Sequence, residues 1–200
     1  MKKNTKNVPS LSSDNLEDGV HITYYENGQK KEEETWKDSQ ENGLLTQWYE
    51  NGQKKLTGTA KDGELNGLCT TWFSNGEKSN EGAFKDGKLD GLFTGWYDNG
   101  QKELEIIYKD GEIDGKRTKW YSNGQKNLEW TYKDGKLDGL LTQWYENGQM
   151  DLEETYKDDK LNGLSTDWYE NGQMKEQGVY KKGEKIGKWE YWNEDGSVKE

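Results

Sequence analysis

The chain has 200 residues, a formal net charge of −11 and a hydrophobic fraction of only 28%. Such a balance is typical of disordered chains, but 10 Trp and 12 Tyr residues recur at fixed spacing and supply the apolar area that a fold needs. The acidic charge excludes nucleic acids and anionic membranes as expected partners, because both attract positive patches. A protein, a sugar or a basic surface is expected instead.

Residues 1–18 contain the only proline, Pro9, and lie outside any repeat. They predict a flexible N-terminal tail. The basic start, Met1 to Asn4, is not followed by the apolar segment of a signal peptide, and no stretch is long and apolar enough to cross a membrane. The expected location is the cytoplasm, or the exterior or cell surface if a signal peptide has been removed.

From residue 19 onward the sequence repeats every 24 residues. Each repeat begins with a framing glycine: Gly19, Gly43, Gly67, Gly91, Gly115, Gly139, Gly163 and Gly187. Five residues later stands a framing aromatic: Tyr24, Trp48, Trp72, Trp96, Trp120, Trp144, Trp168 and Trp192. A strict short period predicts one elongated stack in which each unit contacts only its neighbours. The framing aromatics are predicted to form the structural ladder, and the core, of that stack.

Each repeat holds two turn signals between runs rich in Thr, Trp and Tyr. An Asn-Gly pair, such as Asn51-Gly52, predicts a two-residue type I′ turn and therefore a β-hairpin. An Asp-Gly pair, such as Asp62-Gly63, then turns the chain toward the next hairpin. The predicted fold class is all-β: an elongated array of serial antiparallel β-hairpins over residues 19–200, with seven full repeats and one partial repeat.

Side chains alternate along a strand, so each hairpin is expected to have two faces. The first face is predicted to carry Leu44, Thr46 and Trp48 opposite Lys55, Thr57 and Thr59; the second, Leu45, Gln47 and Tyr49 opposite Lys54, Leu56 and Gly58. A three-residue bulged turn would exchange the faces of the partner strands.

The string Trp-Tyr-Glu-Asn-Gly-Gln at residues 48–53, 144–149 and 168–173, with Tyr-Lys-Asp-Gly-Lys-Leu-Asp-Gly at 132–139, resembles the variant form of the MORN repeat. That variant is found in bacterial proteins classed as YwqK-type antitoxins of toxin-antitoxin systems. The resemblance implies an elongated twisted sheet, no catalytic residues, and work by binding. Three departures, at Ser39-Gln40, Asp158-Asp159 and Lys185-Ile186, predict loosened or capped turns.

Residues with catalytic or metal-binding chemistry are sparse. His21 is the only histidine and Cys69 the only cysteine, so neither a disulfide nor a transition-metal site is expected; Cys69 is expected to fill a small apolar strand position. A column of acids recurs with the repeat: Glu81, Glu105, Glu129 and Glu153. Its members should lie roughly 9–10 Å apart, which favours a solvated face over acid–base catalysis. We therefore expect no enzyme, no cofactor and no metal.

Two features have competing interpretations. One is an invariant lysine column: Lys37, Lys61, Lys85, Lys109, Lys133, Lys157 and Lys181. It is either a basic surface for an acidic partner, or a set of lysines paired with neighbouring aspartates or cross-strand glutamates. The other is the fifth repeat, which alone carries Lys116, Arg117, Lys119 and Trp130. Arg and Trp are enriched in interface hot spots, so these four residues are the candidate partner-binding site; the alternative is drift within a redundant array.

The predicted function is non-catalytic binding of a protein, with neutralisation of a cognate toxin as the role that the resemblance implies. Two alternatives stay open. The aromatic ladder could stack against sugars or choline-type cations in a cell-surface module, or the open end strands could pair between copies in a self-associating scaffold.

Overall fold

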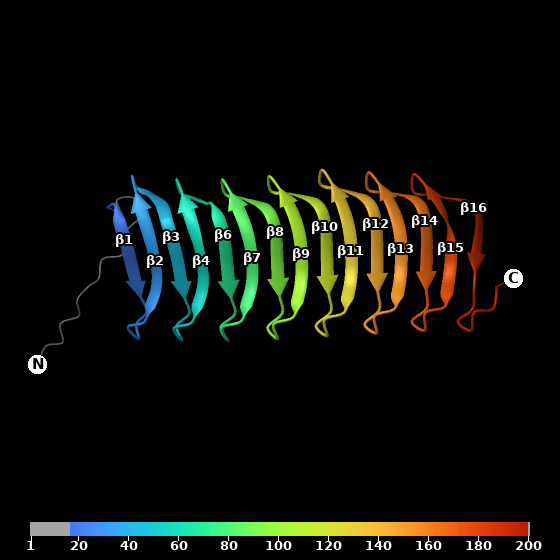
Figure 1. Cartoon of the computed structure of the whole chain (residues 1–200), viewed down its shortest axis with the longest axis horizontal. Helices are drawn as coiled ribbons and strands as arrows, with labels where there is room; N and C mark the ends of the chain where they lie inside the picture. The colour runs from blue at the N-terminus through green and yellow to red at the C-terminus, as the bar shows by residue number, and fades with distance from the viewer. Residues whose placement is uncertain (1–16, 200) are drawn as a thin grey trace, which may run out of the picture.

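The chain forms one antiparallel β-sheet, a single layer in which the strands lie side by side in chain order (Figure 1). The structure is a computed structural model and describes residues 17–199. Sixteen strands form the sheet and no helix occurs within the described range, so the predicted all-β array of hairpins is confirmed. At about 4.8 Å per strand, the sheet is about 70 Å long. The predicted flexible tail lies outside the described residues, apart from Glu17 and Asp18.

The strands are β1 (Gly19–Tyr24), β2 (Lys30–Lys37), β3 (Gln40–Trp48), β4 (Lys54–Lys61), β5 (Glu64–Leu65), β6 (Gly67–Trp72), β7 (Lys78–Lys85), β8 (Lys88–Trp96), β9 (Lys102–Lys109), β10 (Glu112–Trp120), β11 (Lys126–Lys133), β12 (Lys136–Trp144), β13 (Met150–Lys157), β14 (Lys160–Trp168), β15 (Met174–Lys181) and β16 (Glu184–Tyr191). Strands β5 and β6 together occupy the place that a single strand takes in the other repeats.

The turn after each framing aromatic differs from the predicted type. At residues 49–52 the Gly52 N–H donates to the Tyr49 carbonyl at 2.9 Å, and the Tyr49 N–H donates to the Gln53 carbonyl at 2.8 Å. Gly52 has a φ of 84°, whereas Asn51 is not among the residues with positive φ. This is a type I turn closed by a glycine bulge, with a three-residue loop. The prediction of a type I′ turn at Asn-Gly was wrong.

The asparagine of this turn acts through its side chain. The Asn51 Oδ1 accepts a hydrogen bond from the Gln53 N–H at 3.0 Å, and its Nδ2 donates to the Ser74 carbonyl in the next repeat at 2.8 Å. The corresponding inter-repeat bond is made by all seven turn asparagines: Asn27, Asn51, Asn75, Asn99, Asn123, Asn147 and Asn171. The asparagines therefore tie each turn to the next.

Tyrosine hydroxyls form a second ladder beside the asparagines. The residue after the framing aromatic donates its hydroxyl to the framing carbonyl one repeat further on, at 2.7–3.0 Å. The donors are Tyr25, Tyr49, Tyr97, Tyr121, Tyr145 and Tyr169. Phe73 occupies this position in the third repeat and has no hydroxyl to donate.

Type I′ geometry occurs instead at the second turn, where Asp62 and Gly63 have φ values of 52° and 81°. Ser39 and Asp159 replace this glycine, and the loosened turns expected there are not found: their φ values are 63° and 62°, and the flanking strands stay paired. The type I′ turn is thus preserved at these two sites, although a left-handed conformation costs roughly 1 kcal/mol for each non-glycine residue. The third departure, at Lys185, also lies in paired strands, β15 and β16.

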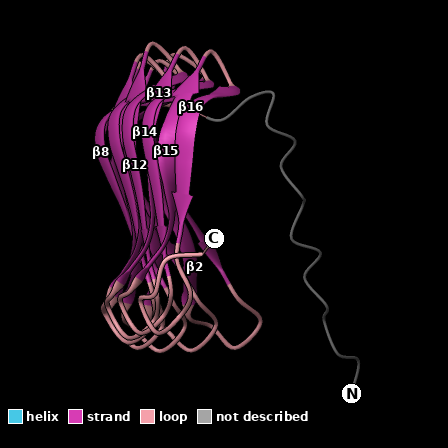
Figure 2. Cartoon of the chain, turned by 90° about the vertical axis from the view of Figure 1, so that its right-hand side faces the viewer, coloured by secondary structure: helices cyan, strands magenta, loops and turns pink. Residues whose placement is uncertain are grey.

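The framing glycines mark the place where a strand bulges against its predecessor. Gly163 has a φ of 148°, and a Cβ built on it would lie 2.7 Å from the Cβ of Thr155. The register between β13 and β14 shifts at this point. Bulges bend the strand that carries them, and the sheet is visibly curved along its strands in Figure 2. A side chain at Gly163 would be both strained and overlapping, and Gly43, Gly67 and Gly139 are crowded in the same way.

The sheet has two faces, which we name by their aromatic residues. The tryptophan face carries the framing aromatics and the positions equivalent to Leu44 and Thr46. The tyrosine face carries the positions equivalent to Leu45, Tyr49 and Gly58. The predicted pairing is confirmed from Leu44 with Thr59 to Gln47 with Leu56.

Next to the turn the pairing shifts by one residue, and Trp48 pairs with Lys54 rather than Lys55. Lys54 reaches over the Trp72 ring of the next repeat, whereas Lys55 lines a hollow on the tyrosine face with Gln47. The predicted faces of these two lysines were therefore wrong. The exchange of faces that a bulged turn implies is confined to them, because the bulge in the strand compensates beyond that point.

Burial in this single layer is shallow. No large side chain is completely buried in the described part, and the buried apolar residues are Ala60, Cys69, Ile106 and Leu141. The small apolar role expected of Cys69 is confirmed, and burial raises the pKa of its thiol. On the tryptophan face the threonine column is buried: Thr70, Thr94, Thr118, Thr142 and Thr166. The expectation that the aromatics form the core needs correction, because the framing tryptophans are only half-buried.

Candidate functional site

Lysines cover one side of the tryptophan ladder. The Nζ atom of a lysine lies 5.3–5.9 Å from the ring centroid of the framing tryptophan one repeat further on. The pairs are Lys30 with Trp48, Lys54 with Trp72, Lys78 with Trp96, Lys102 with Trp120, and Lys126 with Trp144. Cation–π contact at such sites stabilises by about 0.5–1 kcal/mol. These five tryptophans are half-buried, whereas Tyr24, at the open end of the sheet, is 58% exposed.

Four of these five lysines also form ion pairs with glutamates of the acidic column: Lys30 with Glu33, Lys78 with Glu81, Lys102 with Glu105, and Lys126 with Glu129. Sequence analysis assigned this column to a solvated face. Lys78 Nζ lies 2.7 Å from Glu81 Oε2, and this hydrogen bond lowers the pKa of Glu81. Burial alone would raise the pKa of Glu129, but hydrogen bonds from Lys116 and Lys126 bring it below its usual value. The Glu81 and Glu129 carboxylates are thus held in the charged form by neighbouring ammonium groups.

An exposed apolar row also lies on the tryptophan face. It follows the position after the framing glycine: Val20, Leu44, Leu68, Leu92, Leu140 and Leu164. Lys116 interrupts the row in the fifth repeat and forms an ion pair of 2.7 Å with Glu129. The fifth repeat therefore differs from its neighbours on this face.

The other three candidate residues of the fifth repeat lie on the tyrosine face. Arg117 pairs with Trp130 across β10 and β11, as predicted, and its Cζ lies 4.7 Å from the Trp130 ring centroid. Lys119 is two residues along β10 on the same face. The four predicted residues therefore do not form one cluster, because strand alternation puts Lys116 on the opposite face from Arg117.

The surroundings of Arg117 are apolar. Its neighbours across the strands are Ile106 and Trp130, and those of Lys119 are Leu104 and Leu128. The Arg117 Nε is buried without a hydrogen-bond partner. Within residues 17–199, no carboxylate lies within ion-pair distance of this guanidinium. An unpaired guanidinium on an aromatic plane can donate to a planar anion such as a carboxylate.

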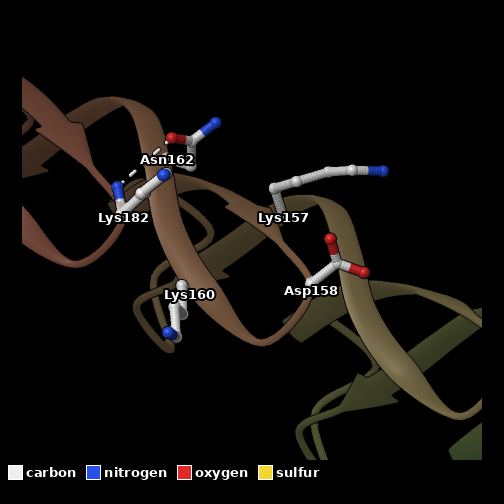
Figure 3. Close-up of a pocket in the computed structure, with 5 residues that line it drawn as sticks. All are labelled: Lys157, Asp158, Lys160, Asn162 and Lys182. Atoms are coloured by element: carbon white, nitrogen blue, oxygen red, sulfur yellow. Dashed lines mark hydrogen bonds between the residues drawn. The ribbon is translucent and has the colours of Figure 1, made fainter.

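The invariant lysine column lies at the second turns and is exposed. Of its described members only Lys157 forms an ion pair, with Asp138 at 2.6 Å, so the predicted general pairing was wrong. Lys157 and Lys182 line a shallow hollow (Figure 3). Their side chains point in different directions, and Asn162 Oδ1 accepts from the Lys182 backbone N–H at 3.2 Å. This arrangement is a solvated turn surface without convergent groups.

A cluster that sequence analysis missed lies at the C-terminal end of the tyrosine face. The Lys185 ammonium lies over Tyr180, Trp189 and Tyr191, with its Nζ 3.7 Å from the Trp189 ring centroid. The signal in the sequence was the appearance of Trp189 and Tyr191 at positions where the preceding repeat has Ser165 and Asp167.

Metal ligands do not gather anywhere in the described range: no group of three or more His, Cys, Asp or Glu residues is placed to hold an ion. His21 is half-buried, and its Nε2 lies 2.5 Å from the Glu17 carbonyl oxygen. No helix among residues 17–199 could span a membrane.

Comparison with known proteins agrees with the repeat geometry. The family model described as the MORN repeat variant matches six segments: residues 17–38, 41–62, 89–110, 113–134, 137–158 and 161–182. Residues 63–88, which include the divided strand β5–β6 and Phe73, lie outside these matches. A search of curated proteins found no match. Since the six matched segments cover more than half of the chain, it belongs to the MORN repeat variant family.

Proposed function

We propose that this chain is a non-catalytic binding protein that holds a protein partner on its tyrosine face, centred on the fifth repeat. The observation that carries the proposal is the Arg117 guanidinium, which is stacked 4.7 Å from the Trp130 ring centroid and has no ion pair among the described residues. In a chain with a net charge of −11, an arginine without a carboxylate partner stands out. Arg and Trp together are typical of the energetic centre of an interface.

The chemistry of this centre favours a carboxylate on the partner. The guanidinium offers a planar fork of donors, and Lys119 adds a second positive charge on the same face. The neighbouring Leu104, Ile106 and Leu128 would be covered together with the ion pair, which strengthens it by excluding water. The partner is thus expected to present an Asp or Glu side chain surrounded by apolar residues.

We further propose that the partner is a toxin whose action is blocked by direct contact. This step rests on the resemblance to YwqK-type antitoxins and on the extended, repeated surface that the array offers to a single partner. Co-expression with the product of a neighbouring gene tests it: the chain should relieve growth inhibition, and the Arg117→Ala/Trp130→Ala variant should relieve it less.

Affinity capture from the native host with three forms of the chain tests the proposal. The parental chain is expected to retain one stoichiometric protein, and Arg117→Ala/Trp130→Ala is expected to lose it, with each truncation weakening binding by about 2 kcal/mol or more. Lys116→Ala is the matched control, because it removes an adjacent charge on the opposite face. Equal capture by the double variant and the control, with both folded, would overturn the proposed site.

A second function, self-association as a scaffold, is favoured by the end strands. Strand β1 pairs only with β2 among the described strands, and its Val20 side chain is 60% exposed. An exposed apolar edge strand is a template for pairing with another chain. Sedimentation velocity over a wide concentration range tests this function: a concentration-dependent dimer that is lost in Val20→Lys supports it, and a monomer throughout contradicts it.

The alternative in which the tryptophan ladder binds sugars or choline-type cations has less support than the two functions above. Lysines already occupy the ring faces of Trp48, Trp72, Trp96, Trp120 and Trp144. A ligand that stacked on this side of the ladder would have to displace the lysine at each of these rings.

A further inference from the structure

The C-terminal end of the tyrosine face gathers three aromatic rings around one ammonium group. Lys185 Nζ lies 3.7 Å from the ring centroid of Trp189 and 6.0 Å from those of Tyr180 and Tyr191. Glu176 Oε2 lies 3.7 Å from the same nitrogen. We call these three rings and this carboxylate the terminal cage.

The terminal cage is a departure from the repeat. The position of Lys185 is held by Leu or Ile in the five preceding repeats: Leu65, Leu89, Ile113, Leu137 and Leu161. The seventh repeat has therefore exchanged an apolar side chain for a cation, and the eighth repeat has gained two aromatic residues, Trp189 and Tyr191, on the same face. The substitutions form one cluster, because Trp189 and Tyr191 lie around the ammonium group of Lys185.

The cage holds its lysine differently from the lysines of the tryptophan ladder. A ladder lysine such as Lys78 lies over one ring at 5.6 Å and donates a hydrogen bond of 2.7 Å to Glu81. Lys185 lies closer, contacts three rings, and is 3.7 Å from its carboxylate, beyond hydrogen-bond distance. The Lys185 ammonium is therefore held by the faces of the rings and by the charge of Glu176, without a hydrogen bond to that carboxylate.

We propose that the terminal cage is a binding site for a trimethylammonium group and that Lys185 is its internal occupant, displaced when the ligand binds. Ring faces attract cations, and aromatic cages bind quaternary ammonium groups because these carry little hydration to remove. Lys185 can leave the cage because its side chain is 44% exposed, and exposed ion pairs and exposed cation–π contacts each contribute little stability.

Access to the cage comes from the end of the sheet. Tyr191 is 39% exposed, and Trp189 and Tyr191 also line a hollow of about 150 Å³ together with Trp192 and Val198. The Trp189 ring is held in place because it packs directly on the backbone of Gly178. A Cβ atom at position 178 would overlap the ring. One rigid ring and one accessible ring thus frame the site. This inference is independent of the partner proposed for the fifth repeat.

The test is a titration of the full-length chain with choline, followed by the indole N–H signal of Trp189 in NMR spectra. The signal should shift saturably, and Lys185→Ala should bind choline roughly three- to tenfold more tightly, because the internal competitor is gone. The neutral carbon isostere of choline, which has the same shape, should bind at least several-fold more weakly than choline to the variant.

Tyr191→Leu keeps an apolar side chain at the accessible position and should weaken choline binding to the native chain and to Lys185→Ala alike. A trimethyllysine peptide and a phosphocholine micelle, compared on Lys185→Ala, distinguish a protein source from a lipid source by which binds more tightly. No saturable shift in Lys185→Ala, equal binding of the neutral isostere, or unchanged affinity in Tyr191→Leu would each overturn the proposal.

Discussion

The tyrosine ladder offers a direct test of how neighbouring repeats are joined, because the array contains both forms of the contact. Tyr121 donates its hydroxyl to the Trp144 carbonyl at 2.8 Å, whereas Phe73 stands at the same position in the third repeat without a hydroxyl. We expect Tyr121→Phe to lower the free energy of unfolding and Phe73→Tyr to raise it, since the added hydroxyl would meet the Trp96 carbonyl.

The expected change in the free energy of unfolding follows from the loss or gain of this one hydrogen bond. A neutral hydrogen bond contributes about 1 kcal/mol net, and the ring itself is kept in both substitutions, so apolar burial is unchanged. For a chain of this length, 1 kcal/mol corresponds to about 2–4 °C in Tm. Tyr121→Phe should therefore melt about 2–4 °C lower than the parent, and Phe73→Tyr higher by a similar amount.

Equilibrium urea unfolding followed by far-UV circular dichroism, with thermal melts of the same samples, measures both changes. A stabilising Phe73→Tyr is the more demanding outcome, because few substitutions stabilise a protein. If Phe73→Tyr were neutral and Tyr121→Phe cost nothing, the hydroxyl ladder would not join the repeats, and the reasoning would be refuted.

Three further predictions concern stability. Gly163→Ala should destabilise more than Gly19→Ala in thermal melts, because both glycines have strongly positive φ but only Gly163 has a neighbouring side chain in the way; equal costs would contradict this. Asp167→Asn should raise Tm at neutral pH, because burial and then nearby carboxylates raise the pKa of Asp167 in the folded state, so its charge is disfavoured there. That gain should vanish at a pH low enough to protonate the carboxyl. Burial raises the pKa of Tyr145 and of Tyr156 to about 12, above the unfolded value, so the folded state keeps these protons longer and loses the resulting stability as pH rises through about 10–12. Ultraviolet absorbance of tyrosinate should show at least two late-ionising groups, and ionisation of all tyrosines near pH 10 in the folded chain would refute the assignment.

Much of the fold followed from the sequence, because period and alternation are global properties of the array. The 24-residue spacing predicted the serial hairpins. The pairing of Leu45 with Gly58 was predicted from an assumed two-residue turn, and it holds because the bulge next to Trp48 compensates for the three-residue loop. The type I′ turn was assigned to Asn-Gly although it occurs at Asp-Gly, since both pairs satisfy the same dihedral rule. The two turns differ in the side chain of Asn51, which donates a hydrogen bond to the next repeat. That contact exists only when the repeats are stacked, so the sequence of one repeat does not predict it.

The candidate site was predicted in part. Arg117 and Trp130 meet as the register requires, but a list of unusual residues in one repeat does not separate the two faces of a strand, so Lys116 was grouped with them. The terminal cage was missed because its residues come from the seventh and eighth repeats. Only the sheet brings Tyr180 and Trp189 together, with ring centroids 5.0 Å apart.

Site-specific photo-cross-linking at two neighbouring positions tests the central claim most directly. A photoreactive residue at position 119 would lie on the tyrosine face beside Arg117, and the same residue at position 116 would lie on the tryptophan face. Expressed in the native host, the chain labelled at 119 should cross-link to one protein partner, whereas the chain labelled at 116 should not. Cross-linking from 116 and not from 119, or equally from both, would contradict binding through the tyrosine face of the fifth repeat.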